Sequence, residues 1–326
     1  MRGSAVGAVV LALLSACAAD AVCQQVPGAQ PARPLMPGGR LRVHDRQIVY
    51  PDGTIFRWRG VTAFALLEQI AHGREADAAA YMRWARDTGF NLVRVLAMAD
   101  NLFRLAPDEG RQHLPRLLTL AAEHGLYVEI VALADTANYR MTRTGLRAQV
   151  TAIGAIAAAH ENSVVQVANE HYHPSQTPDV HDPAVLRDLA GLLPPQVLHT
   201  ESAAAEDTAA EPQGQFITRH LSRNGTPASM AAQVAELGSL SVRMGKPVVN
   251  DEPIGADERS VPGRRLADPD AFRAISRKER EAGLAGGTFH CEDCLYGRIP
   301  GSVQRACARA WIEGAGVSGP SGRRSP

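Results

Sequence analysis

The stretches VVQVANEHYHP (residues 164–174) and KPVVNDEPIG (residues 246–255) decide the fold of this chain. Each contains a short apolar, β-branched run bounded by turn-forming residues, which is the pattern of a buried parallel strand. Each run ends in an acidic residue, Glu170 in the first and Glu252 in the second. Both carboxylates are therefore expected to leave their strands at the carboxyl end.

Similar apolar runs recur along the chain and alternate with segments of helical periodicity. We expect strands at residues 56–61, 91–96, 126–133, 164–168, 196–200, 214–220, 247–251 and 286–290. We expect helices at residues 75–88, 111–124, 144–160, 183–192, 228–244, 268–282 and 303–312, and one with a weaker pattern within 203–212. Eight strands alternating with helices predict an α/β fold, a single (β/α)8 TIM barrel.

The segment that leads into the first strand has a different pattern. LRVHDRQIVYPDGTIFRWRGV (residues 41–61) alternates apolar and polar residues around the turn sequence Pro51-Asp52-Gly53. This pattern predicts an N-terminal β-hairpin, which would cap the bottom of the barrel.

The beginning of the chain has the pattern of an export signal, which we assign to residues 1–22. One early Arg is followed by an apolar stretch that is shorter than the ~20 residues of a membrane span, and then by small residues. The sequence before Cys17 is similar to a bacterial lipoprotein signal, which predicts a lipid anchor at Cys17. Ordinary cleavage after Ala18 or Ala21 is the alternative. We expect either a cell-envelope lipoprotein, periplasmic or at the surface, or a secreted protein.

Composition marks the limits of the folded part. Residues 23–40 are rich in Pro, Gly and Gln and predict a flexible tether, and residues 314–326 predict a disordered tail. The barrel is expected at residues 41–313. In an oxidising compartment Cys291 and Cys294, or either one with Cys307, could form a disulfide.

The charge balance disfavours several partners. Lys plus Arg and Asp plus Glu each number 34, so no strong net field favours nucleic acid or an anionic membrane. A small neutral substrate fits this balance.

The distance between the two acidic residues along the chain is also informative. Glu170 and Glu252 are 252 − 170 = 82 residues apart, which is about three βα units of roughly 25 to 35 residues each. The pair is therefore expected on the fourth and seventh strands, facing one mouth. Barrel enzymes carry their chemistry there, and two such carboxylates can divide acid and nucleophile roles.

From residue 41 to about 312 the chain resembles a cellulase-type glycoside hydrolase of the large retaining (β/α)8 superfamily that includes family 5. The resemblance rests on the opening segment 41–61, Arg94 in FNLVRVL, Asn169-Glu170, and Glu252 in KPVVNDEP. It implies a carbohydrate substrate, Glu170 as acid/base and Glu252 as nucleophile, with no cofactor. It also implies that Asn169 binds the sugar hydroxyl beside the reacting carbon and that Arg94 pairs with the nucleophile.

A retaining enzyme of this kind needs its two carboxyl groups roughly 5 to 5.5 Å apart. An Arg beside Glu252 would keep it ionised, as a nucleophile must be. The simpler alternative for Arg94 is an ion pair with Glu129 of the adjacent strand.

The sequence departs from the family pattern at two strand ends. The eighth strand usually offers a Trp as the floor of the sugar site, and this chain has Phe289 and His290 there. At the end of the sixth strand His220 takes the place of the family's Tyr or His. His171 is a further candidate sugar contact. Aromatic residues are only 5% of the chain, which favours a short oligosaccharide or glycoside over a polysaccharide.

Two other classes of function remain open at this stage. His171, His173, His199, His220 and His290 all fall at predicted strand ends, and with Asp293 or Glu201 they could hold zinc in a metal-dependent hydrolase. That class would normally carry a His-x-His pair on the first strand, which is absent here. The missing Trp also allows a sugar-binding barrel without catalysis.

Overall fold

The computed structural model describes residues 38–204, 214–221, 227–252 and 268–316. The described residues belong to one compact unit, which spans Pro34–Pro326. The predicted export signal, most of the predicted tether, and the tail from residue 317 onward lie outside the described residues.

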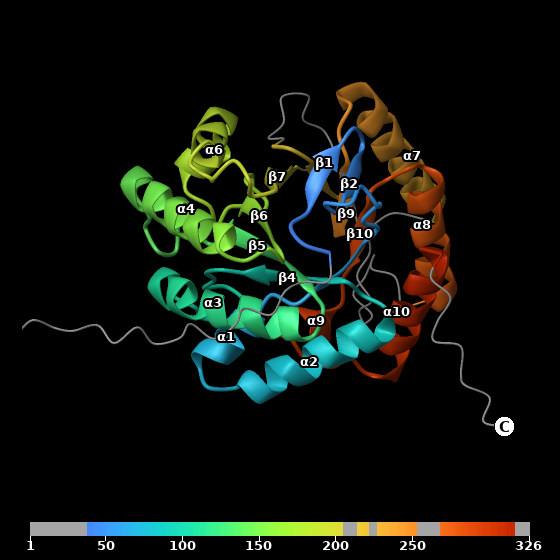
Figure 1. The fold of residues 1–326 in the computed structure, drawn as a ribbon, viewed down its shortest axis with the longest axis horizontal. Helices are drawn as coiled ribbons and strands as arrows, with labels where there is room; N and C mark the ends of the chain where they lie inside the picture. Colours follow the sequence, from blue (N-terminus) through green and yellow to red (C-terminus); the bar gives the residue numbers. More distant parts are fainter. Residues whose placement is uncertain (1–37, 205–213, 222–226, 253–267, 317–326) are drawn as a thin grey trace, which may run out of the picture. The chain divides into compact units, whose positions relative to one another are not determined.

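Eight parallel strands close into a barrel (Figure 1). In pairing order they are β10 (Gly286–Phe289), β3 (Trp58–Thr62), β4 (Leu92–Leu96), β5 (Tyr127–Leu133), β6 (Ser163–Ala168), β7 (His199–Ala204), β8 (Ile217–His220) and β9 (Val248–Glu252). The ring is completed by β10, which pairs in parallel with both β3 and β9. The predicted (β/α)8 barrel is confirmed, and all strand carboxyl ends meet at one mouth.

Helices surround the barrel (Figure 1). Seven correspond to predicted helices: α2 (Glu75–Thr88), α3 (Pro107–Glu123), α4 (Arg143–Ala158), α6 (Pro183–Ala190), α7 (Pro227–Met244), α8 (Pro269–Glu281) and α10 (Ser302–Gly314). The sequence pattern does not reveal the short helices α1 (Leu66–Ala71), α5 (Pro178–His181) and α9 (Glu292–Leu295). Within the described ranges, no helix has the length and apolar character needed to span a membrane.

The helix expected within residues 203–212 is wrong where the structure describes this segment. Ala203 and Ala204 end β7 and pair with Thr218 and Arg219 of β8. Residues 205–212 lie outside the described residues. Pairing with a neighbouring strand overrides the helix propensity of these alanines, which is a weak local preference.

The N-terminal hairpin is present, but its turn is not at the predicted place. β1 (Arg42–His44) pairs antiparallel with β2 (Gln47–Val49), and the turn between them contains Asp45 at φ 52°. Pro51-Asp52-Gly53 instead lies in a second turn, where Gly53 N donates to Tyr50 O at 2.9 Å. The first turn was harder to foresee because Asp adopts positive φ less often than Gly does.

The hairpin covers the amino ends of the barrel strands. Ile48 of β2 and the following Phe56 belong to one buried cluster with side chains from the barrel strands and their amino-terminal ends. The other members are Leu41, Trp58, Leu92, Tyr127, Val164, Leu198, Phe216, Val249 and Ala285. The prediction that the hairpin caps the bottom is confirmed.

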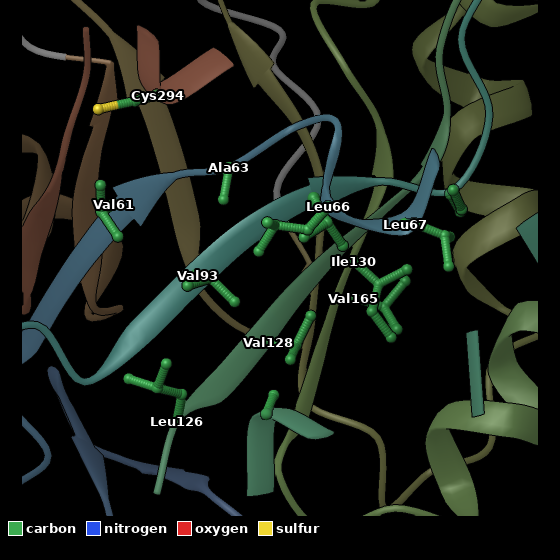
Figure 2. Close-up of a cluster of buried hydrophobic side chains, with 14 of the residues drawn as sticks. Val61, Ala63, Leu66, Leu67, Val93, Leu126, Val128, Ile130, Val165 and Cys294 are labelled. Atoms are coloured by element: carbon green, nitrogen blue, oxygen red, sulfur yellow. The ribbon is translucent and has the colours of Figure 1, made fainter. Parts of the chain in front are cut away.

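The outer faces of the strands form the main core with the helices. Figure 2 shows Val93 of β4, Val128 of β5 and Val165 of β6 among these buried side chains. Successive residues of a strand point to opposite faces. The next residues, Arg94, Glu129 and Gln166, therefore face the barrel interior, where they are fully buried.

A glycine in α3 permits close packing against the end of β4. In Gly110→Ala the added Cβ would lie 1.8 Å from the carbonyl oxygen of Ala97, so the helix must shift, and we expect a loss of about 3 kcal/mol in the free energy of unfolding. The matched control is Gly145→Ala in α4, where the nearest atom, Thr142 Oγ1, would be 3.6 Å away. We expect that variant to gain about 0.5–1 kcal/mol. Urea denaturation followed by circular dichroism measures both, and equal stabilities would contradict this packing.

Candidate active site

Four charged or titratable side chains meet at the carboxyl ends of the strands. Arg94 lies within β4, His220 ends β8 and Glu252 ends β9. Glu170 follows β6 by two residues. The parallel barrel brings them together from four different strands, as it does for catalytic groups in other barrels.

Arg94 is the centre of the cluster. Its Nη1 donates to Glu252 Oε1 at 2.7 Å, and its Nη2 donates to Gln166 Oε1 at 2.7 Å and to Asn169 Oδ1 at 2.9 Å. Its Nε lies 2.8 Å from Asp251 Oδ2. The guanidinium group thus fixes Glu252 and Asn169 in one rigid arrangement, with 0% of the Arg94 side chain exposed.

Arg94 also approaches the residue that the simpler alternative assigned to it. Its Nε lies 3.5 Å from Glu129 Oε2 on the adjacent strand β5. The contact with Glu252 is shorter, so the pairing with Glu129 accompanies the pairing with Glu252 and does not replace it.

His220 bridges the two sides of the mouth. Its Nδ1 lies 2.8 Å from Glu170 Oε1, and its Nε2 lies 3.7 Å from Glu252 Oε1 and 3.8 Å from Asp251 Oδ2. One side-chain atom each of Glu170, His220 and Glu252 lies within 4.8 Å of the others. The two glutamates therefore face one another across a gap that fits a single reacting bond.

Glu170 has an unfavourable backbone conformation. Its φ is 29°, close to the left-handed region that non-glycine residues seldom adopt and that costs roughly 1–3 kcal/mol. Tyr172, two residues later, donates from its hydroxyl to Glu170 Oε1 at 3.2 Å. Such strain persists only when surrounding contacts enforce it, and it is concentrated at functional sites.

The charges of the cluster determine its protonation. Burial alone would lower the pKa of His220, but the charges of Glu252, Asp251 and Glu170 outweigh burial and raise that pKa to about 9. Burial alone would raise the pKa of Asp251, but Arg94 and His220 outweigh it and lower that pKa. Near neutral pH the imidazolium form of His220 therefore lies between carboxylates.

The histidines proposed as zinc ligands do not converge. His290 Nδ1 lies 3.0 Å from Thr62 Oγ1, His173 Nδ1 lies 2.8 Å from Ser175 Oγ, and His199 Nδ1 lies 3.1 Å from the Val197 carbonyl oxygen. Of the five, His220 joins the cluster, where the raised pKa favours its protonated form. Among the described residues, Glu170, His220 and Glu252 are the group whose ligand atoms lie close enough to hold a metal ion, and this group contains one of the five histidines. The strand-end histidines therefore do not form the zinc site considered from the sequence.

The predicted sugar contacts His171 and His290 lie at the edge of the cluster. His171 is buried beside Tyr172, with the ring centroids 5.5 Å apart and the rings at 84°. The His290 and Phe64 rings have centroids 6.4 Å apart at an angle of 64°, and the Phe64 ring centroid is 5.1 Å from Arg94 Cζ. Phe289 is part of the outer core, against Phe90 and Phe272, so it cannot provide the missing sugar platform.

Several residues of the cluster were not among the sequence-based candidates. They are Gln166, Asp251, Tyr172 and Thr288. Gln166 and Asp251 bind Arg94, and Thr288 Oγ1 donates a hydrogen bond to Asp251 Oδ1 at 2.9 Å. The sequence did contain an indication for Gln166 and Asp251. Gln166 is a polar residue within an apolar run, and Asp251 directly precedes Glu252 at the end of another. Such polar residues need a partner when they are buried.

The three cysteines near the last strand include one disulfide pair. Cys291 and Cys294 form a disulfide, and Cys307 is a buried free thiol. The bond closes the turn that follows β10, directly after His290.

No protein-family model matches the sequence, and no curated protein matches it. Solved structures do match the fold. The beta-glucanase SdGluc5_26A from Saccharophagus degradans, in complex with cellotetraose, is 13% identical with a TM-score of 0.64, and the match covers 91% of this chain and 99% of that one. A GH5_18 protein from Streptomyces cattleya, in complex with GlcNAc, is 17% identical with a TM-score of 0.57, and the match covers 79% of each chain.

A family 5 glycoside hydrolase from Bacteroides vulgatus is also similar, with 17% identity and a TM-score of 0.57. That match covers 79% of this chain and 63% of the longer Bacteroides protein. At these identities the likeness concerns the fold. The chain therefore has the barrel fold found in family 5 glycoside hydrolases, in agreement with the resemblance noted from the sequence.

The raised pKa of His220 makes a prediction about stability. A basic group whose pKa is higher in the folded state contributes stability below its unfolded pKa of about 6.5, and this contribution is lost as the pH rises through about 9. From pH 6 to pH 10 the wild type should lose about 3 kcal/mol more of its free energy of unfolding than His220→Gln does.

Urea denaturation at several pH values measures this difference. His173→Gln is the matched control, because His173 is exposed and bonded within its own loop, and it should follow the wild type. If His220→Gln shows the same pH dependence as the wild type, the imidazolium assignment is wrong.

Proposed function

We propose that this protein is a retaining glycoside hydrolase in which Glu252 is the nucleophile and Glu170 the acid/base. The observation that supports this most strongly is the pair itself: oxygens of Glu170 and Glu252 lie within 4.8 Å across one mouth. Carboxyl groups about 5–5.5 Å apart serve retaining enzymes, whereas inverting enzymes need about 6.5–9.5 Å to admit a water molecule.

The two glutamates have different surroundings, as their two roles require. Arg94 donates a hydrogen bond to Glu252 at 2.7 Å, and a charge-assisted bond of this kind favours the carboxylate form that attacks the anomeric carbon. Glu170 forms a hydrogen-bonded pair with His220 at 2.8 Å. The pair shares one proton, which His220 Nδ1 gives to Glu170 and Glu170 passes to the leaving glycosidic oxygen.

The reaction proceeds in two displacements. Glu252 attacks the anomeric carbon while Glu170 protonates the departing oxygen, which forms a glycosyl-enzyme ester. Glu170 then removes a proton from water, the water attacks the same carbon, and Glu252 is released. Asn169, whose Oδ1 is fixed by Arg94 at 2.9 Å, keeps its amide N–H groups available for the sugar hydroxyl beside the reacting carbon.

A short substrate with a β-linked glucose or N-acetylglucosamine residue suits this site. The solved structures of similar fold include a beta-glucanase with cellotetraose and a GH5_18 protein with GlcNAc. The last barrel strand provides no Trp platform, and the Phe289 side chain is fully buried in the core. A long polysaccharide would lack stacking surfaces here, which favours an oligosaccharide or glycoside.

Substitution of the two glutamates tests the assignment. With an aryl β-glycoside that the wild type cleaves, Glu252→Gln should reduce turnover to the background of the assay, because no nucleophile remains. Glu170→Ala should lose about 10²–10⁴-fold with poor leaving groups and much less with a dinitrophenyl leaving group, which needs no acid. Added azide should then restore turnover of Glu170→Ala by attacking the glycosyl-enzyme.

The matched control is Glu236→Gln on the exposed face of α7, which should keep wild-type activity. A folded Glu252→Gln protein with full turnover would exclude Glu252 as the nucleophile. If the wild type binds sugars in calorimetry but cleaves none of the panel, the barrel is a binding protein and the proposal fails.

A further inference from the structure

Two carboxyl groups in the barrel interior compete for one nitrogen of Arg94. Glu129 Oε2 and Asp251 Oδ2 lie 3.5 Å and 2.8 Å from Arg94 Nε. They come from β5 and β9, and 0% of either side chain is exposed. The retaining mechanism uses neither group directly.

The hydrogen bonds around this pair are incomplete if both groups are anions. Both oxygens of Glu129 and Oδ2 of Asp251 are buried without a hydrogen-bond donor that meets standard geometry. Because Glu129 Oε2 and Asp251 Oδ2 both approach the same Arg94 Nε atom, the two carboxyl groups lie close to one another. A single proton on Glu129 would give Asp251 a donor and would satisfy one oxygen of each residue.

The charges of the surrounding groups also favour a neutral Glu129. The ionisable groups that act on Glu129 are Arg94 from β4 and Asp251 and Glu252 from β9, and His220 of β8 lies beyond Asp251. Even with Glu129 neutral, the two cations Arg94 and His220 already face three carboxyl groups, those of Asp251, Glu252 and Glu170. An ionised Glu129 would add an unbalanced buried charge, which is strongly unfavourable.

We propose that Glu129 stays protonated in the folded protein and donates a hydrogen bond to Asp251, so that the Arg94 guanidinium remains committed to Glu252. Glu129 is then a positioning residue, which acts on the nucleophile through Arg94. Burial, followed by the charge of Asp251, also raises the pKa of Glu129 well above its usual value, while Arg94 acts in the opposite direction.

This proton has a measurable effect that does not depend on glycosidase activity. In the unfolded chain Glu129 loses its proton near pH 4.3, as an ordinary Glu does, whereas the folded protein retains it. Stability therefore falls as the pH rises above that value. Relative to Glu129→Gln, the unfolding constant of the wild type should increase about tenfold for each pH unit between pH 4.5 and pH 6.5.

This pH window separates Glu129 from its neighbours. His220 begins to contribute only above about pH 6.5, and the lowered pKa of Asp251 places its effect below pH 4. Burial raises the pKa of Glu279 to about 8. Glu279 is present in both the wild type and Glu129→Gln, so its contribution cancels in the difference between their stabilities. Glu236→Gln, on the surface of α7, is the control, and its unfolding constant should depend on pH as that of the wild type does.

A vibrational measurement reports the proton directly. The infrared difference spectrum of wild type minus Glu129→Gln at pH 6 should contain the carbonyl stretch of a protonated carboxylic acid. Asp251→Asn is the second variant, and it retains Glu129 but removes the neighbouring anion. Glu129 should then ionise against Arg94, and the same band should disappear.

The two results together decide the proposal. It is overturned if the stability difference is independent of pH and the band is absent, because Glu129 is then an ordinary ionised partner of Arg94. If Glu129→Gln does not fold, an Asp251→Asn spectrum identical to that of the wild type overturns it. A wild type without glycosidase activity would refute the function proposed above and leave both of these readouts intact.

Discussion

The structure of the mouth depends on one buried guanidinium group. Arg94 reaches from β4 across the barrel interior to Asp251 and Glu252 on β9, and it also holds Gln166 and Asn169 from the β6 side. A buried cation is tolerated only with anionic and hydrogen-bonding partners. The residues of the barrel interior are therefore constrained to supply those partners, and the same partners include both a candidate nucleophile and a candidate sugar-binding amide.

This constraint explains why so many ionisable groups are buried together. Arg94 stabilises Asp251 and Glu252, those carboxylates in turn raise the pKa of His220 to about 9, and His220 binds Glu170 on the far side of the mouth. The two glutamates are thus linked through alternating charges. Loss of one member leaves its neighbours buried and unpaired, which costs more than the lost contact itself.

The sequence predicted the barrel well because period and order along the chain determine it. Apolar runs such as Val164–Ala168 and Val248–Val249 alternate with helical segments, and that alternation is a local property. The segment at Ala203–Ala204 was predicted wrongly because small residues fit either state and only its pairing with β8 decides. The turn at Asp45 was missed for a similar reason, since it depends on a conformation that Asp adopts only in some contexts.

The main residues of the site were predictable from the sequence, but most of the residues that bind Arg94 were not. Arg94, His220 and Glu252 lie within or end recognisable strands, and Glu170 follows another by two residues, so topology brings all four to one mouth. Glu129 lies opposite Arg94 on the adjacent strand and was foreseen as its partner. Asp251 meets Arg94 only across the barrel interior, which no local pattern shows. The proposed zinc histidines illustrate the same limit, because His173, His199 and His290 sit near strand ends yet turn to other partners.

In the proposed mechanism Glu252, held by Arg94, attacks a sugar that Glu170 protonates from the opposite face. Proton NMR of the first product formed from an aryl β-glycoside measures the configuration of the new anomeric centre most directly. A double displacement at Glu252 should release the β-anomer first, which then mutarotates. Initial formation of the α-anomer would show inversion and would exclude this mechanism.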